Sequence, residues 1–124
     1  MKLHVTRHGQ TQYNIEVRIC GRANVRLTEK GISQAHELAQ SMQDTDVDLI
    51  ISSPLVRAKE TADIVGAAIG VPVEVDDRLA ERDYGVIDGT YEGTPGFMEQ
   101  WVQFGYQYQR VSRCLKLYSV CIIF

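Results

Sequence analysis

The stretch "VTRHGQTQYN", from Val5 to Asn14, places an arginine directly before a histidine and a glycine directly after it. A positive charge beside an imidazole disfavours the charged imidazolium and keeps the ring neutral. Because a neutral imidazole is a nucleophile, His8 next to Arg7 is a candidate for nucleophilic chemistry. Taken alone, the same tripeptide is more often the end of a strand followed by a glycine turn.

Two later stretches carry further groups of the kind that bind anions. "SSPLVRAKETA" holds Arg57 at the start of a helical pattern, and "DDRLAERDYG" holds Glu81 and Arg82. Guanidinium groups and helix N-termini both suit a phosphate group. Taken alone, Arg57 would be a solvated residue of a first helical turn and Glu81 a surface carboxylate. The predicted phosphate site therefore depends on these stretches meeting in space.

Hydrophobic patterns predict the elements that bring these stretches together. Short apolar runs indicate strands, and apolar residues three and four apart indicate helices. In chain order the prediction is a strand at 2–6, a helix at 27–42, a strand at 47–52, a helix at 53–70 and a strand at 71–76. This order predicts an α/β fold, three-layer α/β/α with a mostly parallel sheet. Ligands of such sheets bind beyond the carboxyl ends of the strands, where the three stretches would meet.

The ends of the helices are also marked in the sequence. Thr28 is of the type that caps a helix N-terminus, and Ser53 is a candidate cap for the next helix, with Pro54 in its first position. Gly70 can close that helix, and Pro72 prevents it from continuing. The apolar faces expected to turn toward the core are Ile32, Ala35, Ala39 and Met42 in the first helix, and Leu55, Ala58, Ala62, Val65 and Ile69 in the second.

The pattern weakens after Asp88. A glycine-rich loop, "GTYEGTPG", precedes a candidate amphipathic helix at 97–109 and a candidate strand at 113–124. We treat residues 1–124 as a single domain, and the sequence leaves the structure of the tail at 90–124 open.

Composition narrows the class of protein. The formal net charge of -3 over 124 residues gives no sign of a nucleic-acid partner, and the longest apolar run, "SVCIIF", is too short to span a membrane. Cys20, Cys114 and Cys121 are an odd number without a Cys-x-x-Cys spacing, which favours reduced thiols over a disulfide framework or a zinc site. We therefore expect a cytoplasmic protein with no metal and no cofactor.

Four motifs in this order resemble one known family. "RHGQTQYN", "GRANVRLTEKG", "SSPLVRAKETA" and "LAERDYGVIDG" are similar to the motifs of the histidine phosphatases, the phosphoglycerate mutase-like superfamily. The resemblance covers residues 1 to about 89, which is the N-terminal portion of the family's fold. It therefore implies an incomplete domain with a truncated phosphoglycerate mutase-like fold.

The resemblance implies a role for each candidate residue. His8 would be the nucleophile that takes the phosphoryl group as phosphohistidine, and Glu81 would give a proton to the leaving oxygen. The residues implied to bind the phosphate or line the site are Arg7, Asn14, Gly21 and Arg57. Among the arginines at the rim, Arg82 is the one expected to touch the substrate. Arginine forks can stabilise the charge of phosphoryl transfer without a metal.

One part of the family's machinery has no counterpart in the chain. The family carries a second histidine in a late His-Gly motif, whereas this sequence contains only His4, His8 and His36. The loss of one donor to a developing oxyanion lowers the rate by about 10²–10³, so we expect weakened activity. The leading hypothesis is a phosphatase, or a mutase, acting on a small phosphorylated metabolite. The alternatives are an inactive phosphate-binding or interaction module and a truncated gene product, and the sequence leaves the oligomeric state open.

Overall fold

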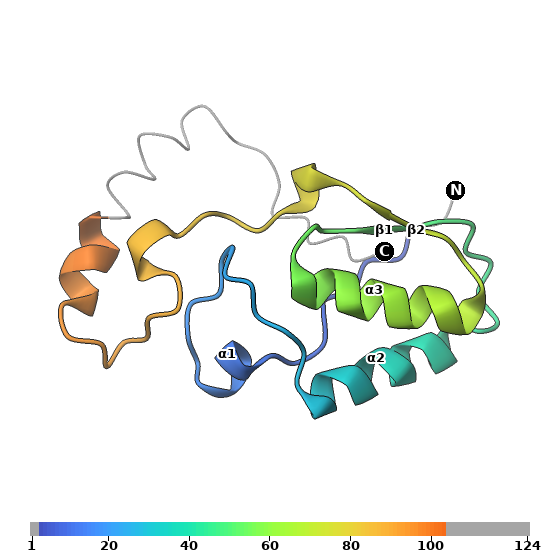
Figure 1. The fold of residues 1–124 in the computed structure, drawn as a ribbon, viewed down its shortest axis with the longest axis horizontal. Helices are drawn as coiled ribbons and strands as arrows, with labels where there is room; N and C mark the ends of the chain where they lie inside the picture. The colour runs from blue at the N-terminus through green and yellow to red at the C-terminus, as the bar shows by residue number, and fades with distance from the viewer. Residues whose placement is uncertain (1–2, 104–124) are drawn as a thin grey trace.

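The computed structural model describes residues 3–103, and their fold is an α/β arrangement (Figure 1). Two long helices and two short strands form its larger part. In chain order the elements are α1 (Gln12–Ile15), α2 (Glu29–Ser41), β1 (Ile50–Ser52), α3 (Val56–Ile69), β2 (Val73–Val75) and the 3-10 helices η1 (Asp77–Leu79) and η2 (Gly85–Ile87). Residues 97–103 are also helical.

The strands β1 and β2 pair in parallel, with Ile50 opposite Val73 and Ser52 opposite Val75. The helix α3 connects the two strands and packs against both, and α2 packs against α3. Both helices lie on the same side of the strands in Figure 1. A strand, a crossover helix and a parallel strand form a βαβ unit, so the predicted α/β class is confirmed.

The core lies where the two helices meet the first strand. It is built from Ala39 and Met42 of the α2 region, Ile50 of β1, and Ala62 and Val65 of α3. Small residues at the helix–helix contact let the backbones approach closely, and Ile50 fills the space between them with 1 % of its surface exposed. The predicted apolar faces are thus largely correct, although one predicted member, Ile32, is 42 % exposed.

The caps of the two long helices differ in how well the sequence marks them. Thr28 accepts a hydrogen bond from the N–H of Gly31 at 3.1 Å and caps α2 as predicted. Gly70 ends α3 with φ of 72°, a left-handed conformation that suits glycine. The predictions of Ser53 as N-cap and of Pro54 as first helical residue are wrong, because α3 begins only at Val56. In the turn before the helix, the hydroxyl of Ser53 accepts the N–H of Leu55 at 3.4 Å. The chain turns there first, and Leu55 becomes the N-cap without a side-chain bond.

The predicted first strand is not part of the sheet. Residues 3–10 have no strand assignment, and Leu3 and Val5 are 66 % and 55 % exposed. A strand requires a neighbour that pairs with its backbone, and the strands described here, β1 and β2, pair with each other. The helix predicted at 97–109 begins at residue 97 as expected. Its later part and the strand predicted at 113–124 lie outside the described residues.

Candidate active site

The segment around His8 is held tightly against the start of α2. A Cβ atom added to Gly9 would lie 2.3 Å from the carbonyl oxygen of Gly31, and one added to Gly31 would lie 2.1 Å from that of Gln10. Only glycine allows two backbones to approach this closely. The N–H of Thr28 donates to the carbonyl of Gln10 at 2.9 Å and ties the segment to the helix cap.

The helix α3 holds the same segment from the other side. The N–H of Gly9 donates to the hydroxyl of Thr61 at 3.1 Å, and this hydroxyl donates to the carbonyl of Arg57 at 2.8 Å. Thr61 is 1 % exposed, so its hydroxyl links two backbone groups within the protein interior. The position of His8 is therefore fixed by its neighbour Gly9 rather than by a regular strand.

The ring of His8 is held in one tautomer. Its Nδ1 lies 2.7 Å from the carbonyl oxygen of Gly9, and because a carbonyl only accepts, Nδ1 carries the proton. The other nitrogen, Nε2, accepts a hydrogen bond from Nε of Arg57 at 3.1 Å. Its lone pair thus faces the guanidinium of Arg57. This is the geometry of a neutral imidazole with Nε2 as the nucleophilic atom.

The surroundings of His8 also keep its ring neutral. Burial lowers the pKa of His8 below its ordinary value, and the positive charges of Arg57 and Arg7 lower it further. The hydrogen bond to Gly9 and the negative charge of Glu81 act in the opposite direction. The net pKa is lowered, as the adjacent arginine in the sequence led us to expect.

Arg57 is the buried cation of the site, with 3 % of its surface exposed. Its Nη2 donates to the carbonyl of Gly21 at 2.8 Å, and its Nη1 donates to that of Ala23 at 3.2 Å. A guanidinium has five N–H donors, and with the bond to His8 three are used. Within residues 3–103, the other two donors have no described acceptor and are available to an anion.

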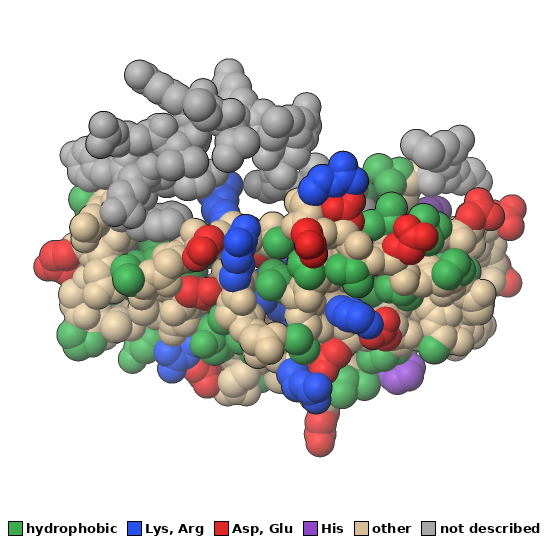
Figure 2. All heavy atoms as spheres, turned by 45° about the horizontal axis from the view of Figure 1, so that its top comes forward, with side chains coloured by type: hydrophobic (Ala, Val, Ile, Leu, Met, Phe, Trp, Pro, Cys, Tyr) green, Lys and Arg blue, Asp and Glu red, His purple; other side chains and the backbone are tan. Residues whose placement is uncertain are grey.

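Arg7 and Glu81 complete the charges around the histidine. Both charges act on the pKa of His8, which Arg7 lowers and Glu81 raises. Arg7 is exposed, whereas Glu81 is half-buried and its Oε1 accepts the N–H of Arg82 at 2.8 Å. Figure 2 shows acidic and basic side chains mixed over the viewed face, without a large region of one sign.

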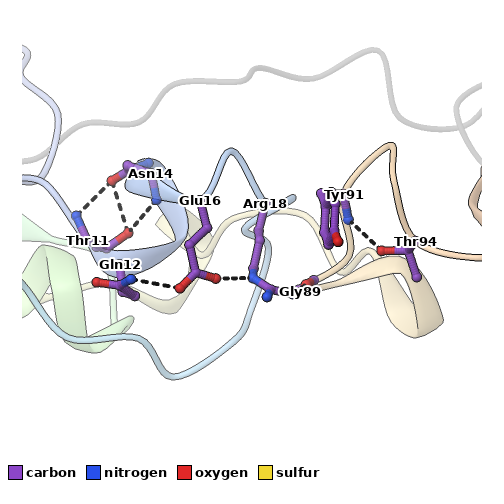
Figure 3. A network of polar contacts seen from close by, with 8 residues as sticks. All are labelled: Thr11, Gln12, Asn14, Glu16, Arg18, Gly89, Tyr91 and Thr94. Carbon is purple, nitrogen blue, oxygen red and sulfur yellow. Dashed lines mark hydrogen bonds and ion pairs between the residues drawn. The ribbon is translucent and has the colours of Figure 1, made fainter.

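The other three predicted ligands have defined surroundings. Asn14 Oδ1 accepts the N–H of Thr11 at 2.8 Å (Figure 3), so its amide nitrogen points away from that bond. The N–H of Gly21 donates to Asp88 at 2.9 Å, and its carbonyl binds Arg57. Arg82 is exposed next to Glu81. That these three residues contact a phosphate stays a prediction.

Sequence reasoning did not identify Asp88. Its Oδ1 accepts the N–H of Gly21 and its Oδ2 that of Ala23, both at 2.9 Å. These partners lie 67 and 65 positions away along the chain, so no local spacing could have revealed the contact. The Asp-Gly pair in "LAERDYGVIDG" was the only signal, and it equally fits a turn.

Arg18 was also missed, and it joins the same two segments. Its Nη1 donates to the carbonyl of Gly89 at 2.7 Å, and it forms an ion pair with Glu16. The guanidinium lies 5.9 Å from the ring centre of Tyr13 and 5.4 Å from that of Tyr91, within the range of cation–π contacts. Figure 3 shows this arginine between α1 and the segment of Tyr91.

Among residues 3–103, the other candidate groups form no second site. Ser52 is buried, and its hydroxyl donates to the carbonyl of Ser53 at 2.9 Å, as expected for a turn residue. Burial raises the pKa of the Cys20 thiol, so the thiol stays protonated at neutral pH. Within residues 3–103, no three histidine, cysteine, aspartate or glutamate side chains are grouped to hold a metal ion. No helix in that range is long and apolar enough to cross a membrane.

Comparison with known proteins identifies the family. The profile of the histidine phosphatase superfamily (branch 1) matches residues 3–113. A protein of Salmonella choleraesuis (strain SC-B67) named "Probable phosphoglycerate mutase GpmB" is 38% identical over 107 residues, which cover 82% of this chain and 50% of that protein. The chain belongs to the histidine phosphatase superfamily. It spans about half the length of the curated relatives that it matches.

Solved structures agree with this assignment. A mycobacterial glucosyl-3-phosphoglycerate phosphatase, solved with VO3, matches with a TM-score of 0.71 and 36% identity over 80% of this chain and 50% of that one. A phosphoserine phosphatase of Entamoeba histolytica, solved with 3-phosphoglyceric acid, has a TM-score of 0.61 and 32% identity, covering 67% of this chain and 41% of that one. The predicted phosphoglycerate mutase-like α/β fold is thereby confirmed.

Proposed function

We propose that this chain is the phosphate-binding part of an enzyme that transfers phosphoryl groups from small phosphomonoesters through His8. The observation that carries the proposal is the contact between Nε2 of His8 and Nε of Arg57. This contact joins a neutral nucleophile to a buried cation that retains unused donors. The contact also sets the place where a phosphate would bind.

The proposed reaction begins when a phosphate enters beside Arg57. The phosphate oxygens accept the hydrogen bond of Arg57 Nε in place of His8, so the lone pair of Nε2 becomes free. A bond then forms between Nε2 and phosphorus while the bond from phosphorus to the ester oxygen breaks, and Glu81 gives a proton to that oxygen. Water next attacks phosphorus while the bond from phosphorus to Nε2 breaks, and the carboxylate of Glu81 takes a proton from this water. Inorganic phosphate leaves, and both the neutral ring and the acid form of Glu81 are restored. Most of the rate would come from positioning and charge stabilisation by the arginines.

The names of the relatives support a substrate class. The Salmonella relative is named as a mutase, whereas the two solved structures are named as phosphatases, one of them for a phosphoglycerate derivative. Both reactions begin with the same transfer to histidine and differ in whether water or a second hydroxyl accepts the group. We favour a phosphatase, because both of these solved structures are named as phosphatases and a loop that would hold a second sugar acid is not legible in the sequence.

A second candidate function is phosphate binding without turnover. It is favoured by the histidine content of the chain, since His36 lies exposed on α2 and His4 belongs to the segment before His8. Neither is followed by glycine, as the family's second histidine is, which donates to the transferred group. On this reading, phosphate binds at Arg57 and the phosphoryl group is not transferred.

Trapping of the intermediate separates the two candidates. The chain is incubated with p-nitrophenyl phosphate or 3-phosphoglycerate, quenched in alkali, and examined for an acid-labile phosphohistidine by mass spectrometry. We expect a label on His8 that is absent in His8→Asn and retained in the matched control His36→Asn. A folded sample that binds phosphate and carries no label would support the second candidate and contradict the first.

A further inference from the structure

The loop of residues 19–23 lies between two groups of opposite charge. Its carbonyls at Gly21 and Ala23 accept hydrogen bonds from the guanidinium of Arg57, at 2.8 and 3.2 Å. The N–H groups of the same two residues donate to the carboxylate of Asp88, both at 2.9 Å. The loop thus turns its acceptors toward the buried cation and its donors toward the carboxylate.

From this arrangement we infer that Asp88 is a positioning residue, which sets the guanidinium of Arg57 against His8 by fixing the two carbonyls that hold it. The inference rests on the proposed function for its catalytic meaning. Its structural content, the effect of Asp88 on Arg57 and His8, is independent of whether phosphoryl transfer occurs.

Charge and geometry both favour this arrangement. Hydrogen bonds to an ionised carboxylate are stronger than those between neutral groups, so Asp88 orders the loop more firmly than an amide or a water would. The carboxylate also polarises the two peptide groups, which makes their carbonyls better acceptors for the cation. In this way the negative charge of Asp88 acts on Arg57 through the backbone.

The rest of the loop is anchored without Asp88. The N–H of Ile19 donates to the carbonyl of Thr90 at 2.8 Å, and the N–H of Gly89 donates to the carbonyl of Ile19 at 2.9 Å. A Cβ atom added to Gly21 would lie 2.6 Å from Cδ2 of Tyr84, which shows how closely the segments pack. Substitution of Asp88 should therefore loosen residues 21–23 without separating the two segments.

The consequence for His8 has a definite direction. The charged groups that act on its pKa are Arg57, Arg7 and Glu81. If Arg57 moves away, the ring loses the nearest positive charge and gains access to water. Both changes raise the pKa of His8 toward its ordinary value of about 6.5. This readout distinguishes positioning from a general loss of stability, which would leave the pKa of the remaining folded molecules unchanged.

The test compares Asp88→Asn and Asp88→Ala with the wild-type chain and with a matched control, Asp83→Asn. Asp83 lies in the same segment, and its carboxylate bonds only the nearby N–H of Gly85 among the bonds described, at 2.8 Å. Affinity for inorganic phosphate is measured by calorimetry, and the pKa of His8 by NMR titration of its ring. Thermal unfolding of each variant is recorded alongside.

We expect Asp88→Asn to bind phosphate about tenfold more weakly and to raise the pKa of His8, because a charge-assisted bond is lost at the loop. Asp83→Asn should match the wild type. If Asp88→Ala does not fold, Asp88→Asn decides, since it keeps the volume and one acceptor. Equal phosphate affinity and equal His8 pKa in wild type and Asp88→Asn would overturn the inference, as would the same changes in Asp83→Asn. A wild-type chain that binds phosphate but forms no phosphohistidine would refute the proposed function alone. The role of Asp88 would still be tested, because phosphate affinity and the pKa of His8 can be measured without phosphoryl transfer.

Discussion

Removal of the guanidinium in Arg57→Ala tests the site most directly. The side chain is 3 % exposed and donates to Nε2 of His8 and to the carbonyls of Gly21 and Ala23. Each lost charge-assisted bond costs about 1.5–3 kcal/mol of folding free energy. The substitution also removes the desolvation cost of a buried cation, which no carboxylate within residues 3–103 offsets by pairing with it. The two effects oppose each other, so we expect a small change in stability without phosphate.

The large change should be in the response to phosphate. At a phosphate concentration 100 times Kd, the wild type gains about 2.7 kcal/mol of unfolding free energy, a rise in Tm of roughly 10 °C. Two donors of Arg57 remain for the anion, and the loss of both weakens binding by about 3–6 kcal/mol, or more than a hundredfold. At the same phosphate concentration the variant should then gain less than about 0.5 kcal/mol.

Differential scanning fluorimetry over a range of phosphate concentrations measures both effects. Arg57→Lys keeps the charge without the fork and should give an intermediate shift. The control Arg78→Ala removes a charge from an exposed arginine that pairs with Asp76, and it should respond like the wild type. A rise in Tm of equal size in wild type and Arg57→Ala would refute the reasoning, because phosphate would then bind elsewhere.

Three further outcomes follow from the same contacts. The pKa of His8 is lowered in the folded chain, so below about pH 6.5 the unfolded chain binds more protons than the folded chain. The free energy of unfolding, measured by urea titration, should therefore fall as the pH drops below about 6.5 and level off above it. The variant His8→Asn should show a flatter pH dependence. Thr61→Val leaves the buried N–H of Gly9 without its acceptor and should cost about 1–3 kcal/mol, whereas Thr61→Ser, which keeps the oxygen, should cost less; equal losses would argue against the bond. Gly9→Ala places a Cβ 2.3 Å from the carbonyl oxygen of Gly31 and should lower stability by about 1–3 kcal/mol and weaken phosphate binding, and an unchanged Tm would contradict the close approach.

Much of the fold could be predicted because the relevant signals are local. The two long helices, α2 and α3, follow from apolar residues spaced three and four apart, and Thr28 and Gly70 mark ends through their own side-chain chemistry. The paired strands β1 and β2 follow from short apolar runs. The α1 helix was not predicted, because four residues with a Thr11–Asn14 capping box have no apolar period to detect.

The first strand shows where local signals end. "KLHVT" has the alternation of a strand, yet residues 3–10 form none, because a strand exists only through hydrogen bonds with a neighbour. The same limit applies to Ser53, whose type suits a cap but which lies two residues before the actual N-cap, Leu55. In both cases the residue type suits the predicted element, but the hydrogen bonds that would form the element depend on other parts of the chain.

By itself, the sequence determined which residues are the candidates for the proposed chemistry: His8 and Arg7 beside each other, Arg57 in a later helix and Glu81 beyond it. Residue types and the order of motifs are written in the chain, so they and the family could be read without coordinates. Only the tertiary structure decided which atoms meet: Nε of Arg57 on Nε2 of His8, and Asp88 across the loop that holds the arginine. These partners are 49 to 67 positions apart, and contacts over such separations depend on the packing of the whole domain rather than on any local spacing.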